Sequence, residues 1–238
     1  MPEMMKISSN EPLKTIPEPE VFESLLSLDH KNILELGCGD AALTRLIESN
    51  GANRTITALE VDMIQHQKNI EIKDLPGVSF KLGACEDIPA PDNTFDIVFM
   101  FKSLHHVPTD KLSPALLEIK RVLKPGGLAY ISEPVFAGDF NEILKLFHNE
   151  EKVRQAAFDA LQESVNRHTF ELVDELFFNT SVCFDDFSQF KIKVIGATHS
   201  EHRLSDELLQ IVQQKFLQTT QFNRGQFLIP IRVDLLRA

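Results

Sequence analysis

The feature that most constrains the fold of this chain is the stretch 32–43, which reads N-I-L-E-L-G-C-G-D-A-A-L. The apolar run at 33–36 is typical of a strand that is buried on both faces of a parallel sheet. Gly37 and Gly39 then allow positive φ angles and a close approach of a ligand to the backbone. A helix is expected to open at Ala41, so the stretch predicts a ligand-binding turn between a strand and a helix.

The charge of this turn narrows the choice of ligand. Glu35 precedes the first glycine and Asp40 follows the second. From Asn32 through the turn, the first lysine or arginine is Arg45. A pyrophosphate in the turn would face these carboxylates, although a helix N-terminus by itself favours anions. S-adenosylmethionine carries no phosphate and has two cationic groups, so an acidic turn with free backbone N–H groups favours this methyl donor over a dinucleotide.

Strand and helix patterns alternate through the first half of the chain. This alternation predicts a doubly wound parallel sheet, in which ligands lie beyond the carboxyl ends of the strands. A helix at 18–28 comes first and could cover the sheet edge or act as a lid. The expected strands lie at 33–36, 55–60, 78–82, 95–101 and 128–132, and the helices between them at 41–50, 63–72 and 110–123.

Several polar or small residues follow these strands. Glu60 ends the second strand, where an acid can accept both ribose hydroxyls of an adenosine, although a solvated charge is the alternative. Asp62 is expected to cap the next helix. The small-residue turn at 83–87 could accommodate an adenine. Cys85 in this turn has no basic neighbour in sequence that would lower its pKa, so a nucleophilic role is disfavoured.

Five motifs in order resemble the class I S-adenosylmethionine-dependent methyltransferases. The similarity covers about 30–135 and is greatest to the branch of small-molecule enzymes that includes the quinone-biosynthesis type. The motifs are I-L-E-L-G-C-G-D-A at 33–41, the acid Glu60, G-A-C-E-D-I-P-A-P-D-N-T-F-D at 83–96, S-L-H-H-V at 103–107 and E-I-K-R-V-L-K-P-G-G at 118–127.

The resemblance implies a set of cofactor-binding residues. The methionine part would contact Glu35, Gly37, Cys38 and Gly39, and the ribose would contact Glu60. The adenine would contact Ala84 and Cys85, and the neighbouring residues Val61, Glu86 and Phe101 complete the set. Two departures concern Ala41, where the family often has a third glycine, and Ala84, where it often has an aspartate. The residues after the fourth strand, Lys102 onward, lack the Asn-Pro-Pro-aromatic motif of adenine-methylating nucleic-acid enzymes.

The resemblance extends the expected fold to a mostly parallel, Rossmann-like sheet of seven strands in a single domain, 1–238, with a helical cap inserted at about 136–204. In the second half we expect helices at 139–154, 155–168 and 185–194, a sixth strand at 177–184, a helix from Ser205 as N-cap to about 219, and a final strand at 227–235, antiparallel beside the fifth.

Methyl transfer needs positioning, and it needs a general base only if the acceptor loses a proton. His106 and His105 are the candidate bases, and Glu133 could orient the acceptor. One of Arg203, Arg224 and Arg232 could hold a substrate carboxylate, although a surface ion pair is the alternative for each. No histidine or cysteine spacing indicates a metal site.

Composition excludes some classes of partner. The 238 residues carry a formal net charge of -11, which argues against non-specific nucleic-acid binding and favours a small-molecule acceptor. Three cysteines without a disulfide spacing indicate a cytoplasmic protein, and the lack of a long apolar run indicates that no segment spans a membrane. We expect a monomer or a homodimer. The alternatives are a nucleotide-dependent oxidoreductase and a catalytically silent protein that binds the donor product, S-adenosylhomocysteine.

Overall fold

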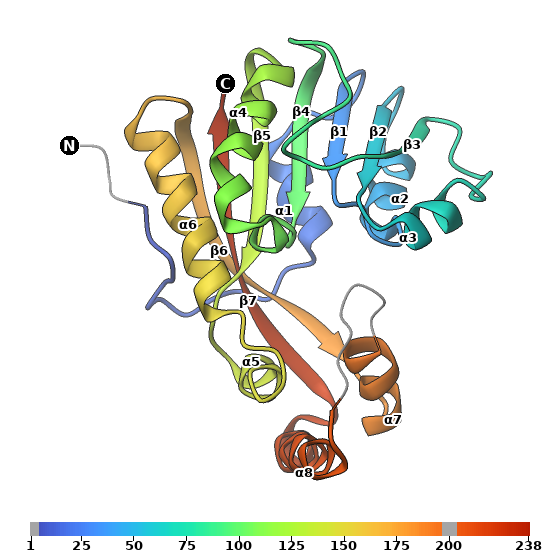
Figure 1. Cartoon of the computed structure of the whole chain (residues 1–238), viewed down its shortest axis with the longest axis vertical. Coiled ribbons are helices and arrows are strands. Elements are labelled where there is room, and N and C mark those ends of the chain that lie inside the picture. Colours follow the sequence, from blue (N-terminus) through green and yellow to red (C-terminus); the bar gives the residue numbers. More distant parts are fainter. Residues whose placement is uncertain (1–4, 197–203) are drawn as a thin grey trace.

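A computed structural model describes residues 5–196 and 204–238 (Figure 1). Its seven strands form one sheet in the order β3-β2-β1-β4-β5-β7-β6. The strands from β1 to β5 pair in parallel, and β7 is antiparallel to both β5 and β6. The predicted fold class and the insertion of the last strand beside the fifth are therefore confirmed.

The strands are β1 (Asn32–Leu36), β2 (Thr55–Glu60), β3 (Val78–Leu82), β4 (Phe95–Phe101), β5 (Leu123–Pro134), β6 (Glu171–Cys183) and β7 (Gln226–Arg237). The α-helices are α1 (Glu18–Leu25), α2 (Ala42–Ser49), α3 (Met63–Asn69), α4 (Leu112–Val122), α5 (Asp139–Leu144), α6 (Glu151–Asn166), α7 (Phe187–Phe190) and α8 (Asp206–Asn223). Short 3-10 turns lie at Leu104–His106 and Thr109–Lys111, and a π-turn at Lys191–Ile195.

The predicted bounds fail mainly after β4. β5 begins at Leu123, ahead of the Pro-Gly-Gly segment, because the strand resumes its pairing with β4 after a register shift. In place of the helices expected at 139–154 and 155–168, the structure has α5 and α6, with the chain at 145–150 between them. β6 starts at Glu171 rather than 177, since an edge strand tolerates the exposed acids that obscured the pattern in sequence.

Helices cover both faces of the sheet. On one face α4 and α6 pack with the apolar side chains of β1, β4 and β5. On the other face α1 brings Phe22 into an aromatic cluster with Phe99, Phe101 and Tyr130, whose ring centroids lie 5.0 to 6.2 Å apart. Phe22 has no exposed surface, so α1 is part of the core on this face.

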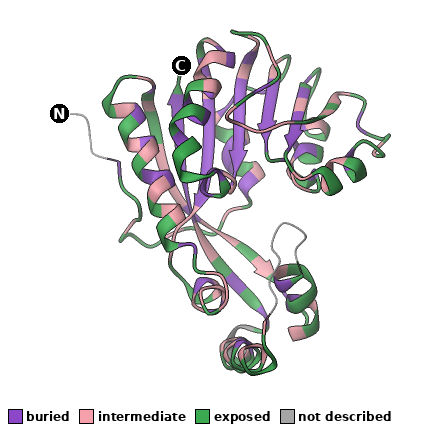
Figure 2. Ribbon diagram, viewed as in Figure 1, coloured by how far each residue is buried: buried purple, intermediate pink, exposed green. Residues whose placement is uncertain are grey.

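The long strands β6 and β7 extend past the other strands and carry α5, α7 and α8 at their far end (Figure 1). These helices enclose a separate apolar core that includes Phe184, Phe190, Phe216 and Phe227. Figure 2 shows buried strands in the centre of the sheet and mostly exposed helices around this extension. In the insertion expected to form a cap, α6 packs beside α4, and α5 and α7 belong to the extension.

In the part of the chain that the structure describes, no helix has the length and apolar character needed to cross a lipid bilayer.

Candidate functional site

The turn after β1 has the backbone geometry that its glycines predict. Gly37 and Gly39 have φ angles of 71° and 53°, and Ala41 is also left-handed at 63°. A Cβ atom on Gly39 would have no heavy atom within 4 Å, whereas one on Gly37 would lie 3.0 Å from the Ser103 Cβ. Gly37 therefore allows close packing against the loop after β4, and Gly39 leaves open space above the turn.

Most backbone N–H groups of this turn are already paired within the protein. Those of Gly37 and Cys38 donate to the Leu59 carbonyl at 2.9 and 3.0 Å, and that of Gly39 donates to the Glu60 Oε2 at 2.8 Å. The N–H of Ala42 donates to Asp40 Oδ1 at 3.2 Å. The expectation of free amide groups is wrong for these four groups, which a pyrophosphate could bind only by replacing the hydrogen bonds they already make.

Glu60 holds the turn and its own strand end together. Its Oε1 accepts the N–H groups of Val61 and Asp62, each at 2.8 Å, in addition to the bond from Gly39. The carboxylate is 7% exposed. Asp62 accepts the Ile64 N–H at 2.8 Å and caps α3, as predicted.

Glu35 is buried beneath the turn. Thr44 donates its hydroxyl to Glu35 Oε2 at 2.6 Å. Burial raises the pKa of Glu35 to about 8; the Thr44 hydrogen bond lowers it, and the charges of Glu60 and Asp40 raise it further. The Glu35 carboxyl is therefore largely protonated near neutral pH, and the exposed negative charge of the turn comes from Asp40.

An exposed apolar surface lies at the ends of β2 and β3. Val61 is 68% exposed and Leu82 46% exposed, and Leu82 pairs with Glu60 across the two strands. Ala84, Cys85 and Glu86 follow in a partly buried turn. Burial and the adjacent Glu86 raise the pKa of the Cys85 thiol to about 12, so this thiol is not a thiolate at neutral pH.

The end of β4 supplies an aromatic side chain and a loop. Phe101 is 8% exposed and stacks on Phe99 within the aromatic cluster. Lys102, with a φ of 52°, pairs with the buried carboxylate of Glu18. Ser103 donates its hydroxyl to the Leu36 carbonyl at 3.1 Å, which fixes the start of the loop against β1.

His105 is buried between two carboxylates. Its Nδ1 lies 2.5 Å from Glu133 Oε2, and its Nε2 lies 3.5 Å from Glu150 Oε1. Burial opposes the charge of the imidazolium, but Glu133 and Glu150 outweigh it and raise the pKa of His105 to about 9. Glu133 also accepts the Leu104 N–H at 2.9 Å. His105 is thus an imidazolium at neutral pH and a poor general base.

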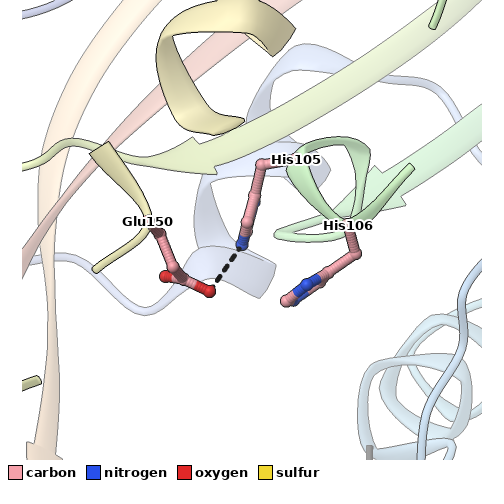
Figure 3. A group of neighbouring side chains, drawn as sticks. All are labelled: His105, His106 and Glu150. Carbon is pink, nitrogen blue, oxygen red and sulfur yellow. Dashed lines mark ion pairs between the residues drawn. The ribbon is translucent and has the colours of Figure 1, made fainter. Parts of the chain in front are cut away.

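Figure 3 shows His105 directed at Glu150, with His106 on the same turn. His106 is exposed, and its ring centroid lies 4.1 Å from that of His105. One donor atom from each of the three residues lies within 4.8 Å of the others, so they could hold a metal ion. Glu150 already contacts His148 at 2.9 Å and Arg154 at 2.5 Å, so ion pairs account for the cluster without a metal.

Sequence reasoning missed three residues at this edge. Asn69 is buried and donates to the Gly39 carbonyl at 2.7 Å, which ties α3 to the glycine turn. Glu150 and Arg154 belong to the histidine cluster. Glu150 and Arg154 are an i,i+4 pair, but no local signal shows their link to His105, which comes from a distant segment. The amide of Asn69 within a helix is the signal that could have marked that residue.

The candidate arginines have other surroundings. Arg232 is buried, donates to Asp234 at 2.8 Å and lies 4.6 Å from the Phe158 ring. Arg224 ends α8 in a left-handed conformation, on the extension. Arg203 lies outside the described residues. The arginine that lies beside the histidine cluster is Arg154.

Parts of this chain are similar in sequence to known methyltransferases. Residues 34–131 match the family model described as a methyltransferase domain. An uncharacterized methyltransferase of Mycobacterium tuberculosis is 34% identical over 110 residues, which cover 46% of this chain and 42% of that protein. A fatty-acid O-methyltransferase of Mycolicibacterium smegmatis is 30% identical over 100 residues, covering 42% of this chain and 36% of that protein. The chain thus spans less than half the length of these curated relatives.

A solved structure extends the comparison to the whole fold. It is the crystal structure of a provisionally assigned methyltransferase of Bacillus halodurans, with a TM-score of 0.63 and 16% sequence identity. The match covers 92% of this chain and 98% of that one. At this identity the likeness concerns the fold alone, and its coverage extends beyond residues 34–131, which the family model matches.

Proposed function

We propose that this chain is a class I S-adenosylmethionine-dependent methyltransferase that transfers a methyl group from S-adenosylmethionine to a small-molecule acceptor. The match of residues 34–131 to the methyltransferase-domain model and the similarity to curated methyltransferases support this proposal. The observation that carries the proposal is the closure of Glu60 onto the glycine turn beside an exposed apolar strand end. A ligand with cationic and apolar parts and no phosphate fits this edge of the sheet.

The residues present fit the methyl donor. Open space above Gly39 admits the methionine part next to Glu35 and Cys38, and Val61 and Leu82 offer an apolar surface for the adenine. On this proposal, Glu60 exchanges some of its backbone hydrogen bonds for the ribose hydroxyls, which are donors of similar strength. The remaining proposed contacts are those of Gly37, Ala84, Cys85, Glu86 and Phe101.

The main alternative is a nucleotide-dependent oxidoreductase. Its pyrophosphate would lie near the Asp40 and Glu60 carboxylates, which already accept the N–H groups of Ala42 and Gly39. Two like charges 4 Å apart near a protein surface repel by roughly 4 kcal/mol. This cost has no compensating cation in the turn, which favours the methyl donor.

S-adenosylmethionine, when bound, supplies an electrophilic methyl carbon. The task of the protein is then to align the acceptor and, for an acidic acceptor group, to take its proton. We assign the role of accepting this proton to the exposed His106. Glu133 and His105 act as positioning residues, because their ion pair fixes the 3-10 turn from which His106 projects.

A transfer assay with S-adenosylmethionine labelled in its methyl group tests the function. The full chain is incubated with a panel of phenols, amines, quinols and carboxylic acids, and label in the organic product is counted. Transfer to one class confirms the proposal. Label transfer to none, with S-adenosylhomocysteine bound at micromolar affinity, would instead support the catalytically silent alternative.

His106→Ala separates the proton-transfer role from binding. We expect kcat to fall by about 10²-fold to 10⁴-fold, the usual contribution of a general base, with the affinity for S-adenosylhomocysteine unchanged. His148→Ala removes another histidine that contacts Glu150 and serves as the control. Equal kcat values for His106→Ala and the wild type would remove His106 from the mechanism.

A further inference from the structure

A cavity of about 130 Å³ lies where the chain leaves β4 and β5 and enters α5 and α6. Its polar side chains are Lys102, Asn141 and Arg154. Lys102 directly follows β4, and Arg154 pairs with the Glu150 that contacts His105. The cavity is therefore adjacent to the loop that carries His106.

The polar groups of this cavity are donors without enough acceptors. Asn141 is 4% exposed, and its Nδ2 has no hydrogen-bond partner. The Nε of Arg154 is likewise buried and unpaired. The one side-chain acceptor that lines the cavity, Asn141 Oδ1, already accepts from Arg154 at 3.3 Å. Unpaired buried donors are costly, so a ligand that offers acceptor atoms would be stabilised here.

The charges of the cavity favour an anion among such acceptors. Lys102 and Arg154 are its charged residues, and both are cations. Their carboxylate partners, Glu18 and Glu150, do not line the cavity. An ammonium has three donors and a guanidinium five, so each cation can serve its carboxylate and a ligand together. Hydrogen bonds to a charged acceptor are about twice as strong as neutral ones.

The rest of the wall is apolar and comes from Pro134, Val135, Phe140 and Ile229. A volume near 130 Å³ is that of about four waters, enough for a carboxylate and the first carbons attached to it. A phosphate has no apolar part and would leave the apolar wall without a partner. The surroundings match a carboxylate at the end of an apolar chain.

We propose that this cavity binds the carboxylate of the methyl acceptor, which makes the acceptor an apolar carboxylic acid. This assignment rests on the proposed function, because it treats the cavity as the acceptor end of the same site. It differs from the sequence expectation in that Arg154, with Asn141 and Lys102, takes the role considered for Arg203, Arg224 and Arg232.

Octanoate is the probe for this proposal. The full chain, saturated with S-adenosylhomocysteine, is titrated by calorimetry with octanoate, with the neutral octanamide and with the cationic octylamine. We expect octanoate to bind at least tenfold more tightly than either analogue. Equal affinities for octanoate and octanamide would overturn the proposal, because the cavity would then select the alkyl chain alone.

Asn141→Asp tests the location. This substitution keeps an oxygen for the bond from Arg154 but replaces the unpaired donor with a negative charge, so octanoate affinity should fall at least tenfold. Asn149→Asp makes the same chemical change at an exposed residue before α6 and should leave the affinity unchanged. Circular dichroism spectra confirm that both variants are folded. Asn141→Leu, which removes the unpaired donor without adding charge, should also weaken octanoate binding and guards against misfolding of Asn141→Asp.

The outcomes distinguish this inference from the proposed function. Binding of S-adenosylhomocysteine without any octanoate binding would overturn the carboxylate site and leave the methyltransferase function intact. Octanoate binding that is lost in Asn141→Asp, in a protein that does not bind S-adenosylhomocysteine, would support the cavity and refute the proposed function. Unchanged octanoate binding in Asn141→Asp would place the carboxylate elsewhere and refute the cavity.

Discussion

The Gly39 N–H donates to the Glu60 carboxylate at 2.8 Å, so the acid at the end of β2 closes the glycine turn at the end of β1. The same carboxylate accepts the N–H groups of Val61 and Asp62. Glu60 therefore organises the site before any ligand arrives, and it holds the Gly39 N–H, which is one of the donors that a phosphate in the turn would need.

Glu60→Ala removes both this closure and the proposed ribose contact. We expect affinity for S-adenosylhomocysteine to fall by roughly 1 to 3 kcal/mol, since two hydroxyls lose a charged acceptor. Calorimetry measures the loss. Asp62→Asn is the control, because it removes a charge two residues away and keeps an N-cap side chain. Unchanged affinity in Glu60→Ala would remove the ribose assignment.

Gly39→Ala and Gly37→Ala separate ligand space from internal packing. Each Cβ in a left-handed backbone costs roughly 1 to 2 kcal/mol of unfolding free energy. The Gly37 Cβ would also press on Ser103, so Gly37→Ala should be the less stable variant in urea. The Gly39 Cβ meets no protein atom, so Gly39→Ala should lose S-adenosylhomocysteine affinity instead. Full affinity in Gly39→Ala would show that the ligand lies elsewhere.

The pH dependence of stability should report Glu35. Its pKa, about 8, exceeds the value of 4.5 expected in the unfolded chain, so folding takes up a proton between these values. The free energy of unfolding should then decrease as pH rises from 4.5 to 8. Glu35→Gln cannot titrate, so its stability relative to the wild type should increase over this range in urea titrations. A difference that does not change with pH would contradict the raised pKa.

His105 should show a pH effect in a higher range. A folded pKa near 9, against 6.5, means that its ion pairs stabilise the protein fully below pH 6.5 and lose that contribution as pH rises through 9. The difference in unfolding free energy between the wild type and His105→Gln should therefore shrink by roughly 3 kcal/mol over that interval. Thermal melts at several pH values, with His106→Gln as control, measure it. A constant difference would mean that His105 is neutral.

The sequence predicted the cofactor half of the sheet well because β1, β2 and β4 are mostly buried strands and turn residues mark the strand ends. The bounds of β2, β3 and β4 were predicted residue for residue. β4 is largely apolar and buried, whereas β3 is mostly exposed and follows the turn at 75–77. The Asp62 cap was also confirmed, since the capping bond is local. Local signals sufficed wherever burial or a turn set the structure.

The second half was harder to predict because its structure depends on distant partners. The break between α5 and α6 contains Glu150, whose partner His105 lies in the loop after β4. β6 alternates poorly because it is an edge strand with exposed acids such as Asp174. The cavity around Asn141 combines segments from β4, β5, α5, α6 and β7, which no window of the sequence contains.

The most direct test of the account compares two ligands on one protein. Calorimetry of the full chain measures its affinity for S-adenosylhomocysteine and for NAD⁺, and so shows which ligand binds at the glycine turn that Glu60 closes. We predict binding of one S-adenosylhomocysteine per chain at micromolar affinity, and no binding of NAD⁺. Binding of NAD⁺ without affinity for S-adenosylhomocysteine would contradict the account.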